Sequence, residues 1–129
     1  MKGYQILVTG ANGFVGQRLL NALFAYECKI RILSSKPHSD FETIICDLEQ
    51  DQIPDKTLDS VDVVFHLAGY AHDFQVVSKV NHIYHKVNVD ATLQLAKLAV
   101  QHRVKSFVFV SSVKAGGSSN DGCCATEDN

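Results

Sequence analysis

The stretch that decides the fold reads Thr9-Gly10-Ala11-Asn12-Gly13-Phe14-Val15-Gly16. It stands between a β-rich run at residues 4–9 and a helical apolar repeat at residues 14–26. Gly10 permits a tight turn off the strand, Gly13 lets the backbone approach a diphosphate without a Cβ in the way, and Gly16 lets the helix pack closely on the sheet. The helix N-terminus favours an anion at the same point. We therefore predict a loop that holds the pyrophosphate of NAD or NADP.

The residues expected to contact the dinucleotide in this loop are Gly10, Asn12, Gly13, Phe14, Val15 and Gly16. A glycine triplet alone is weak evidence, and a tight turn with incidental glycines is the alternative. The binding loop is favoured because the triplet follows a strand, opens an amphipathic helix and begins a β-α-β unit.

Further strand-like runs lie at residues 29–33, 43–46, 61–67 and 106–110. Residues 83–102 predict a long helix, whose narrow polar stripe consists of Asp90, Gln94, Lys97 and Gln101. So little polar surface indicates a helix that is covered on more than one side. The alternation of strands and helices predicts an α/β fold: a Rossmann-like, doubly wound parallel sheet of about five strands in three α/β/α layers.

The end of the second strand bears on the choice between NAD and NADP. A unit that prefers NAD usually has an acidic residue there to bind the ribose hydroxyls. This sequence has Ser34, Ser35 and Lys36 instead, and these side chains suit a 2′-phosphate. We therefore predict cofactor contacts at these three residues with a slight preference for NADP; the alternative for Lys36 is a solvated turn residue.

Composition limits the remaining classes of function. The net charge of −2 gives no reason to expect nucleic acid as a partner, and no apolar run is long enough to span a membrane. Met1 to Tyr4 lead straight into the first strand, which leaves no room for a signal peptide, so we expect a cytoplasmic protein. Cys28 and Cys46 are interpreted as small apolar residues. The histidines, including the pair His82 and His85, do not predict a metal site.

We expect a single domain in this chain of 129 residues. The NAD(P)-binding domain is placed at residues 1–117. From Ala115 onward the sequence turns to Gly, Ser, Asn and Asp, so residues 118–129 are predicted to be a flexible polar tail.

Five motifs occur in a characteristic order, and the sequence resembles the extended short-chain dehydrogenase/reductase superfamily in its NAD-dependent epimerase/dehydratase branch. The narrower similarity is to nucleotide-sugar 4-epimerases and 4-reductases. The resemblance to the superfamily covers residues 4 to about 117, and residues 62–117 carry most of the narrower similarity. The motifs are the glycine loop at 9–16, Cys46-Asp47-Leu48, His66-Leu67-Ala68-Gly69, Val87-Asn88 with Thr92 and Leu95, and Phe109-Val110-Ser111-Ser112.

The resemblance implies roles for individual residues. Asp47 would bind the adenine amino group and Leu48 would line the adenine pocket; the alternative for Asp47 is a helix cap or a turn acid. Leu67, Ala68 and Gly69 would pass under the dinucleotide, where small side chains are needed. His66 is interpreted as a packed core histidine rather than a base.

Two catalytic residues are also implied by the resemblance. Ser112 aligns with the family's catalytic Ser or Thr, which hydrogen-bonds the oxygen on the sugar carbon that is oxidised or reduced; its neighbour Ser111 is the alternative. Asn88 resembles the helix asparagine that supports the active site, and a locally satisfied polar residue is the alternative. The family's Tyr-x-x-x-Lys motif is absent from the 129 residues, which look like an enzyme cut short of its active site.

The resemblance therefore implies the NAD(P)-binding portion of an enzyme that acts by hydride transfer at C4 of a UDP-linked sugar, inactive as this chain alone. Its partners would be the dinucleotide and, in a full-length parent, a nucleotide sugar. By the same resemblance, the helix at 83–102 would pair with a later helix and with a second subunit. Without the later helix its apolar surface would be exposed, which predicts a homodimer or self-association. The alternatives are a non-catalytic, redox-sensing NAD(P)-binding module and a structural domain with a vestigial loop.

Overall fold

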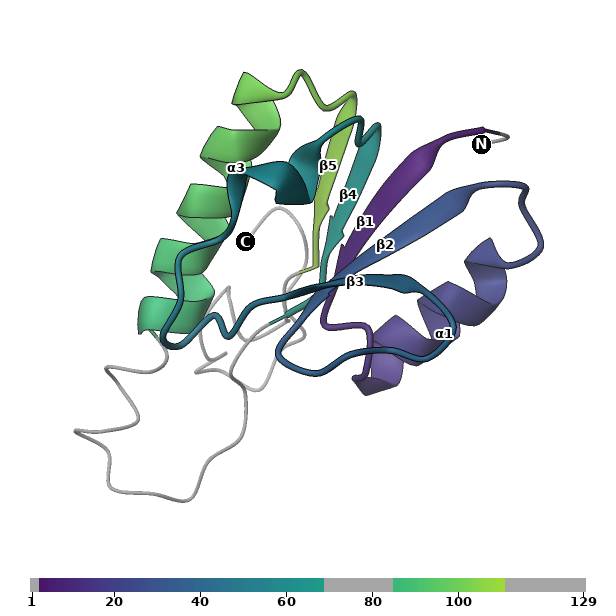
Figure 1. Ribbon diagram of the computed structural model, residues 1–129, viewed down its shortest axis with the longest axis horizontal. Coiled ribbons are helices and arrows are strands. Elements are labelled where there is room, and N and C mark those ends of the chain that lie inside the picture. The colour runs from purple at the N-terminus through teal and green to yellow at the C-terminus, as the bar shows by residue number, and fades with distance from the viewer. Residues whose placement is uncertain (1–2, 69–84, 111–129) are drawn as a thin grey trace, which may run out of the picture.

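A parallel β-sheet forms the centre of the computed structural model, which describes residues 3–68 and 85–110 (Figure 1). In these residues the sheet has five strands in the order β3-β2-β1-β4-β5, and every neighbouring pair is parallel. The strands are β1 (Gln5–Thr9), β2 (Lys29–Ser34), β3 (Glu42–Ile45), β4 (Val63–His66) and β5 (Ser106–Phe109). The predicted Rossmann-like, doubly wound sheet is confirmed.

Helices cover both faces of this sheet, as Figure 1 shows. Helix α1 (Phe14–Leu23) lies on one face and helix α3 (Ala91–Gln101) on the other. A π-helical stretch, η2 (His85–Asp90), leads directly into α3, and a short 3₁₀-helix, η1 (Asp55–Leu58), packs beside α3. The three α/β/α layers are therefore those expected from the sequence.

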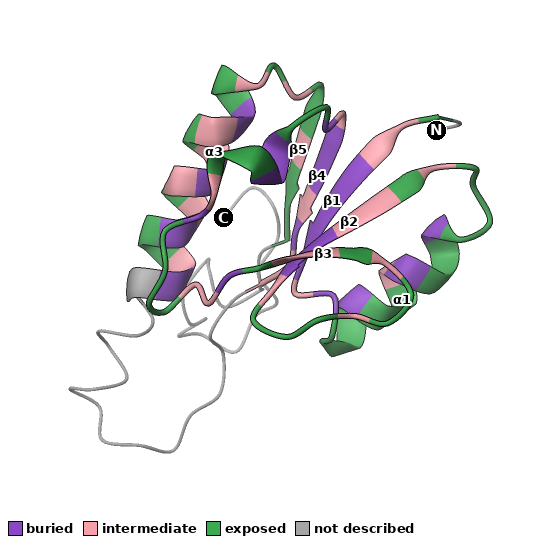
Figure 2. Ribbon diagram, viewed as in Figure 1, coloured by how far each residue is buried: buried purple, intermediate pink, exposed green. Residues whose placement is uncertain are grey.

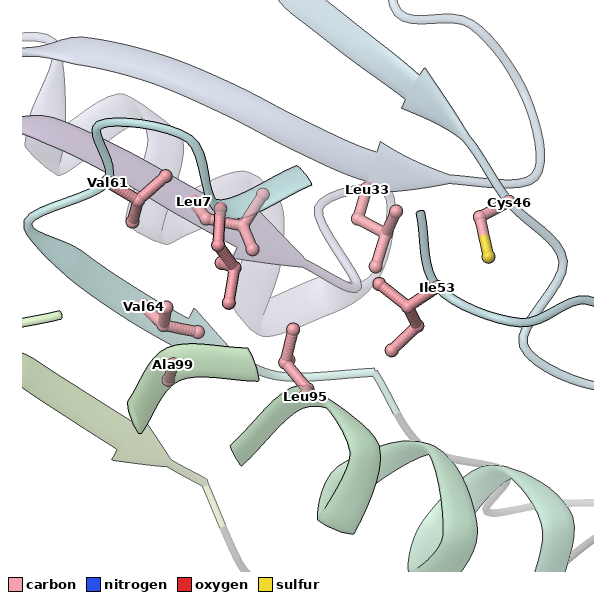
Figure 3. Close-up of a cluster of buried hydrophobic side chains, with 9 residues drawn as sticks. Leu7, Leu33, Cys46, Ile53, Val61, Val64, Leu95 and Ala99 are labelled. Carbon is pink, nitrogen blue, oxygen red and sulfur yellow. The ribbon is translucent and has the colours of Figure 1, made fainter. Parts of the chain in front are cut away.

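Alternate residues of the strands build two separate cores. In β1, Leu7 points toward α3, whereas its neighbours Ile6 and Val8 point toward α1. All three are fully buried, so β1 is the purple strand in the middle of Figure 2. Figure 3 shows the core on the α3 side, where Leu95 and Ala99 reach from α3 toward the sheet. A strand buried on both faces is nearly continuously apolar, which explains the run Ile6-Leu7-Val8 in β1.

The structure differs from the sequence prediction at several element ends. Helix α1 ends at Leu23, three residues before the predicted end at Tyr26, because its last turn tightens: the Tyr26 N–H donates to the Leu23 carbonyl rather than to a residue four back. Residues 35–41 join the parallel neighbours β2 and β3 without a helix, so the alternation is incomplete there. The 3₁₀-helix η1 was not predicted.

Helix α3 is buried along one side. The buried residues recur at every fourth position: Val87 in η2, then Ala91, Leu95 and Ala99 in α3. By contrast, Leu93 and Val100 are 55% and 79% exposed. Within the described residues, the predicted cover on a second side of this helix is therefore missing. No helix in residues 3–68 and 85–110 has the length and apolar character required to cross a bilayer.

Truncation of Leu95 should cost much more stability than truncation of Leu93. Leu95 is fully buried between α3 and the sheet, so Leu95→Ala leaves a cavity and should lower the free energy of unfolding by about 2–5 kcal/mol. Leu93→Ala on the exposed side is the matched control and should change it by less than about 1 kcal/mol. Urea unfolding measures both, and equal losses would contradict the assigned packing of α3.

Candidate functional site

The candidate site lies where the strand order reverses, between β1 and β4. The chain leaves β1 toward β2 on one side, and β4 continues toward β5 on the other, so the loops after β1 and β4 diverge at the carboxyl edge of the sheet. The register pairs Thr9 with Leu33 of β2 and with His66 of β4. The residues that follow these three are therefore brought together although they come from distant parts of the sequence.

A cleft of about 380 Å³ opens at this edge. Nine of the residues predicted to bind cofactor line it: Gly10, Asn12, Gly13, Ser34, Ser35, Asp47, Leu48, Leu67 and Ala68. Five further lining residues were not predicted: Ala11, Leu33, Cys46, Glu49 and Val87. Each lies next to a predicted residue in the sequence, so their proximity to a motif is the signal that could have identified them. A cleft of this size at a topological switch point suits part of a dinucleotide.

Four predicted cofactor residues within the described part of the chain do not line this cleft. Phe14 is 72% exposed and its ring lies 3.5 Å from the Arg18 guanidinium carbon. Val15 is half exposed, Lys36 is exposed, and Gly16 is buried behind the glycine loop. Gly69 and Ser112 lie outside the described residues.

Gly10 is required by its conformation and by its neighbours. Its φ of +72° is in the left-handed region, and a Cβ there would lie 2.7 Å from the Ala68 nitrogen and from the Leu67 carbonyl carbon. The backbone of the glycine loop therefore rests directly on the backbone that follows β4. No side chain other than hydrogen fits at this position.

The other two glycines differ in what surrounds them. A Cβ on Gly16 would overlap the Gly10 carbonyl oxygen and lie 2.7 Å from the Ala11 Cα, so Gly16 packs the helix against the loop rather than against the sheet as predicted. A Cβ on Gly13 would meet only the Gly10 carbonyl oxygen, at 3.4 Å, and would otherwise project into open space. Gly13 is thus the glycine whose bare backbone faces the cleft.

The start of α1 is suited to an anion. Gly13 is the N-cap residue, no side chain accepts a hydrogen bond at this cap, and the first turn holds no acidic residue. The loop itself is closed by the Gly13 N–H, which donates to the Gly10 carbonyl at 3.1 Å. The first N–H groups of a helix lack partners within the helix, so they are available to a phosphate placed here.

Polar contacts connect the glycine loop to the end of β2. The Asn12 amide donates to Ser34 Oγ at 3.4 Å, and the same Ser34 oxygen accepts the Lys36 backbone N–H at 3.2 Å. Ser34 therefore sits between the predicted phosphate loop and the segment predicted to meet the adenosine ribose.

The segment after β3 forms the opposite wall. Asp47 Oδ1 accepts the Glu49 N–H at 2.9 Å, so this carboxylate has the turn role that the sequence left as an alternative while it also lines the cleft. Burial, together with the Asp51 and Asp47 carboxylates, raises the pKa of the Cys46 thiol. Cys46 is therefore an uncharged, buried wall residue, consistent with its interpretation as a small apolar side chain.

His66 is buried under the floor of the cleft. Its Nδ1 lies 2.7 Å from Thr9 Oγ1 and its Nε2 lies 2.8 Å from Thr92 Oγ1. Its ring stacks on Phe109 with 5.6 Å between the centroids. Burial lowers the pKa of His66 to about 4, so its imidazole is neutral at physiological pH. These surroundings support the interpretation of His66 as a core histidine.

Of the two predicted catalytic residues, only Asn88 lies in the described part of the chain, and it is beside the cleft. Asn88 lies in η2, next to the cleft residue Val87, and is half-buried. The Val110 N–H donates to the His66 carbonyl at 3.2 Å, which brings the end of β5 beside the end of β4. Ser111 and Ser112 follow Val110 directly in the sequence. Within residues 3–68 and 85–110, no group of three or more His, Cys, Asp or Glu side chains could hold a metal ion.

Stability should fall as His66 is forced to ionise. The unfolded chain binds this proton near pH 6.5 and the folded chain near pH 4, so the contribution is complete above pH 6.5 and is lost as the pH falls toward 4. Between pH 7 and pH 5 His66 alone should remove about 2 kcal/mol from the free energy of unfolding. In denaturant titrations at several pH values, His66→Asn, which cannot ionise, should show a correspondingly flatter pH dependence. An unchanged slope would contradict a neutral His66.

Proteins of known function match the chain over nearly its whole length. A UDP-glucose 4-epimerase of Vibrio cholerae is 34% identical over 134 residues, which cover 96% of this chain and 40% of that protein. A solved structure described as MoeE5 in complex with UDP-glucose and NAD is 28% identical with a TM-score of 0.76, over 90% of this chain and 39% of that one. A UDP-N-acetylglucosamine 4-epimerase from Methanobrevibacter ruminantium M1, in complex with UDP-N-acetylmuramic acid, is 27% identical with a TM-score of 0.79, over 98% and 44% of the two chains.

The three matches cover only part of each relative's length, and they agree with a single family. The chain spans less than half the length of each of the three proteins. The sequence profile described as "NAD dependent epimerase/dehydratase family" matches residues 6–129. The resemblance drawn from the motifs is confirmed, and the chain belongs to the NAD dependent epimerase/dehydratase family.

Proposed function

We propose that this chain is the NAD(P)-binding portion of a nucleotide-sugar epimerase, dehydratase or reductase that acts at C4 of a UDP-linked sugar by hydride transfer. The observation that carries the proposal is the bare backbone of Gly13 beside an uncapped helix N-terminus, in a cleft at the switch point of the sheet. The names of the matched proteins support the substrate class, since two are 4-epimerases of UDP-linked sugars and one was solved with UDP-glucose and NAD.

The residues present fit a dinucleotide across the cleft. The pyrophosphate would lie at the glycine loop, the adenosine between Ser34 and Asp47, and the nicotinamide toward Leu67, Ala68 and Gly69. The bound nicotinamide would supply the hydride acceptor or donor. The chain's own residues would hold the diphosphate with backbone N–H groups and exclude water from the floor with apolar side chains.

Two residues of this chain are proposed to take part in catalysis. Ser112 would hydrogen-bond the reacting sugar oxygen, and Asn88 would support that site from η2. None of the tyrosines Tyr4, Tyr26, Tyr70 and Tyr84 has a lysine four residues later, so the Tyr-x-x-x-Lys pair of the family is not among these 129 residues. We therefore expect dinucleotide binding without turnover.

The exposed side of α3 supports the proposed self-association. Leu93 and Val100 project from it although both are large apolar residues. A second copy of the chain, or a later helix of a longer protein, would remove this surface from water.

Replacement of Gly13 should weaken dinucleotide binding without impairing folding. Gly13 has φ of −79° and space for a Cβ, so Gly13→Ala should change the free energy of unfolding by less than about 1 kcal/mol. The added methyl group would occupy the place of the diphosphate and should weaken NADH binding by about tenfold or more. Nicotinamide fluorescence titration of the full chain measures the affinity.

The contrasting variant is Gly10→Ala, which should unfold more easily by more than about 2 kcal/mol, because its φ is positive and its Cβ would overlap the Ala68 backbone. The absence of saturable binding of NADH and of NADPH to the unmodified chain would overturn the proposed function and favour a structural domain. Unchanged NADH affinity in Gly13→Ala would overturn the assigned phosphate site.

The slight preference for NADP is tested at Lys36. We expect the full chain to bind NADPH more tightly than NADH, and Lys36→Met to raise the dissociation constant of NADPH alone by roughly two- to fivefold, because an exposed ion pair with the 2′-phosphate is lost. Lys29→Met, at the opposite end of β2, is the matched control for net charge. Tighter binding of NADH, or an equal effect of both substitutions, would contradict the preference.

A further inference from the structure

Three side chains from three elements form a continuous chain of hydrogen bonds under the cleft. Thr9 ends β1, His66 ends β4, and Thr92 lies in the first turn of α3. Thr9 and His66 are partners in the strand register, 57 residues apart, with 2.7 Å between Oγ1 and Nδ1. His66 Nε2 lies 2.8 Å from Thr92 Oγ1. We call this chain of hydrogen bonds the Thr9–His66–Thr92 relay.

The hydrogen positions in the relay follow from the partners of Thr9. Its Oγ1 accepts the Ala68 backbone N–H at 3.1 Å, and it shares the Leu67 N–H, also at 3.1 Å, with the Thr9 carbonyl oxygen at 3.2 Å. A hydroxyl has two lone pairs and one proton. While both amides point at the two lone pairs, the hydroxyl proton is left to be donated to His66 Nδ1. The remaining ring nitrogen, Nε2, then carries the hydrogen and donates it to Thr92 Oγ1.

This arrangement selects a single form of His66. A charged imidazolium would direct an N–H of Nδ1 at the Thr9 oxygen, which would have to give up its share of the Leu67 amide or release the Ala68 amide in order to accept it. The other neutral tautomer has the same conflict. The ring is 1% exposed and stacks on Phe109, so water cannot replace the lost bond.

The relay acts on the backbone against which the glycine loop is built. The Ala68 nitrogen is the atom that a Cβ on Gly10 would approach to 2.7 Å, and Ala68 lines the cleft. A displacement of the Leu67–Ala68 backbone would therefore move the contact surface of Gly10. At its other end the relay fixes Thr92, which follows the η2 segment containing Asn88.

We propose that His66 is a positioning residue for the dinucleotide: through Thr9 it holds the Leu67–Ala68 backbone in the conformation that receives the cofactor, and through Thr92 it ties that backbone to the start of α3. This inference rests on the proposed function. A merely space-filling residue would not need the relay, in which every side-chain nitrogen and oxygen has a partner. By contrast, the hydroxyl of the fully buried Thr57 has no hydrogen-bond partner within residues 3–68 and 85–110, so burial of a threonine in this fold does not by itself produce such a network.

Removal of single hydroxyl groups tests the relay. Thr9→Val keeps the shape of the side chain but leaves the Ala68 N–H without its acceptor, so it should weaken NADH binding by about tenfold. Thr9→Ser, which restores the hydroxyl, should recover most of that loss. Thr92→Val should weaken binding by about threefold because His66 Nε2 loses its acceptor. Thr57→Val, the matched control, removes a hydroxyl for which the described part of the chain shows no partner, and it should leave the affinity unchanged.

Nuclear magnetic resonance gives a readout that would not change if His66 served only to fill space in the core. The ¹⁵N shifts of His66 should report the neutral Nε2–H tautomer, and the Ala68 amide should exchange slowly in the unmodified chain and faster in Thr9→Val. An Nδ1–H or charged His66 would overturn the inference, as would NADH affinity unchanged in both valine variants. If Thr9→Val does not fold, Thr92→Val at the far end of the relay decides. Failure of the unmodified chain to bind NADH or NADPH would instead overturn the proposed function and the cofactor role together.

Discussion

The site depends on the close approach of two backbones at the switch point of the sheet. Gly10 and the Leu67–Ala68 segment touch without a side chain between them, and Gly16 brings α1 against the same loop. Each contact requires glycine because backbone atoms cannot move aside as the end of a flexible side chain can. The cleft depends on this contact. The glycine loop forms its phosphate side, the Leu67–Ala68 backbone forms its floor, and these two segments pack directly on each other.

The layers of the fold keep that interface in place. Leu7, buried toward α3, and Ile6 and Val8, buried toward α1, fix β1 from both faces. The end of β1 therefore cannot shift without opening a core. His66 adds a polar connection at the end of β4, where every hydrogen-bonding atom is satisfied. Apolar packing thus fixes the strands, and directional bonds fix where their ends point.

Much of this could be predicted from the sequence because the signals are local. The spacing of Gly10, Gly13 and Gly16 indicates the phosphate loop, and the apolar run through Val64 indicates a strand buried on both faces. The rest depends on register between distant segments. Nothing near Thr9 in the sequence indicates His66 as its partner. Cys46 lines the cleft because β3 pairs with β2, and Val87 lines it because η2 leads into α3, which packs on the sheet. The exposed side of α3 could not be predicted for the same reason, because the periodicity of the helix predicts its apolar faces but not which neighbours cover them.

The uncapped start of α1 has a consequence for how a ligand would arrive. The loop closes on itself through the Gly13–Gly10 bond, and no side chain occupies the cap. The glycine loop is therefore formed before a phosphate enters it, so hydrating water has to leave but the loop itself does not have to be ordered. A flexible loop would lose conformational entropy when it binds the ligand, whereas this loop has already lost that entropy during folding. Encounter, rather than rearrangement of the loop, would then limit the rate of association.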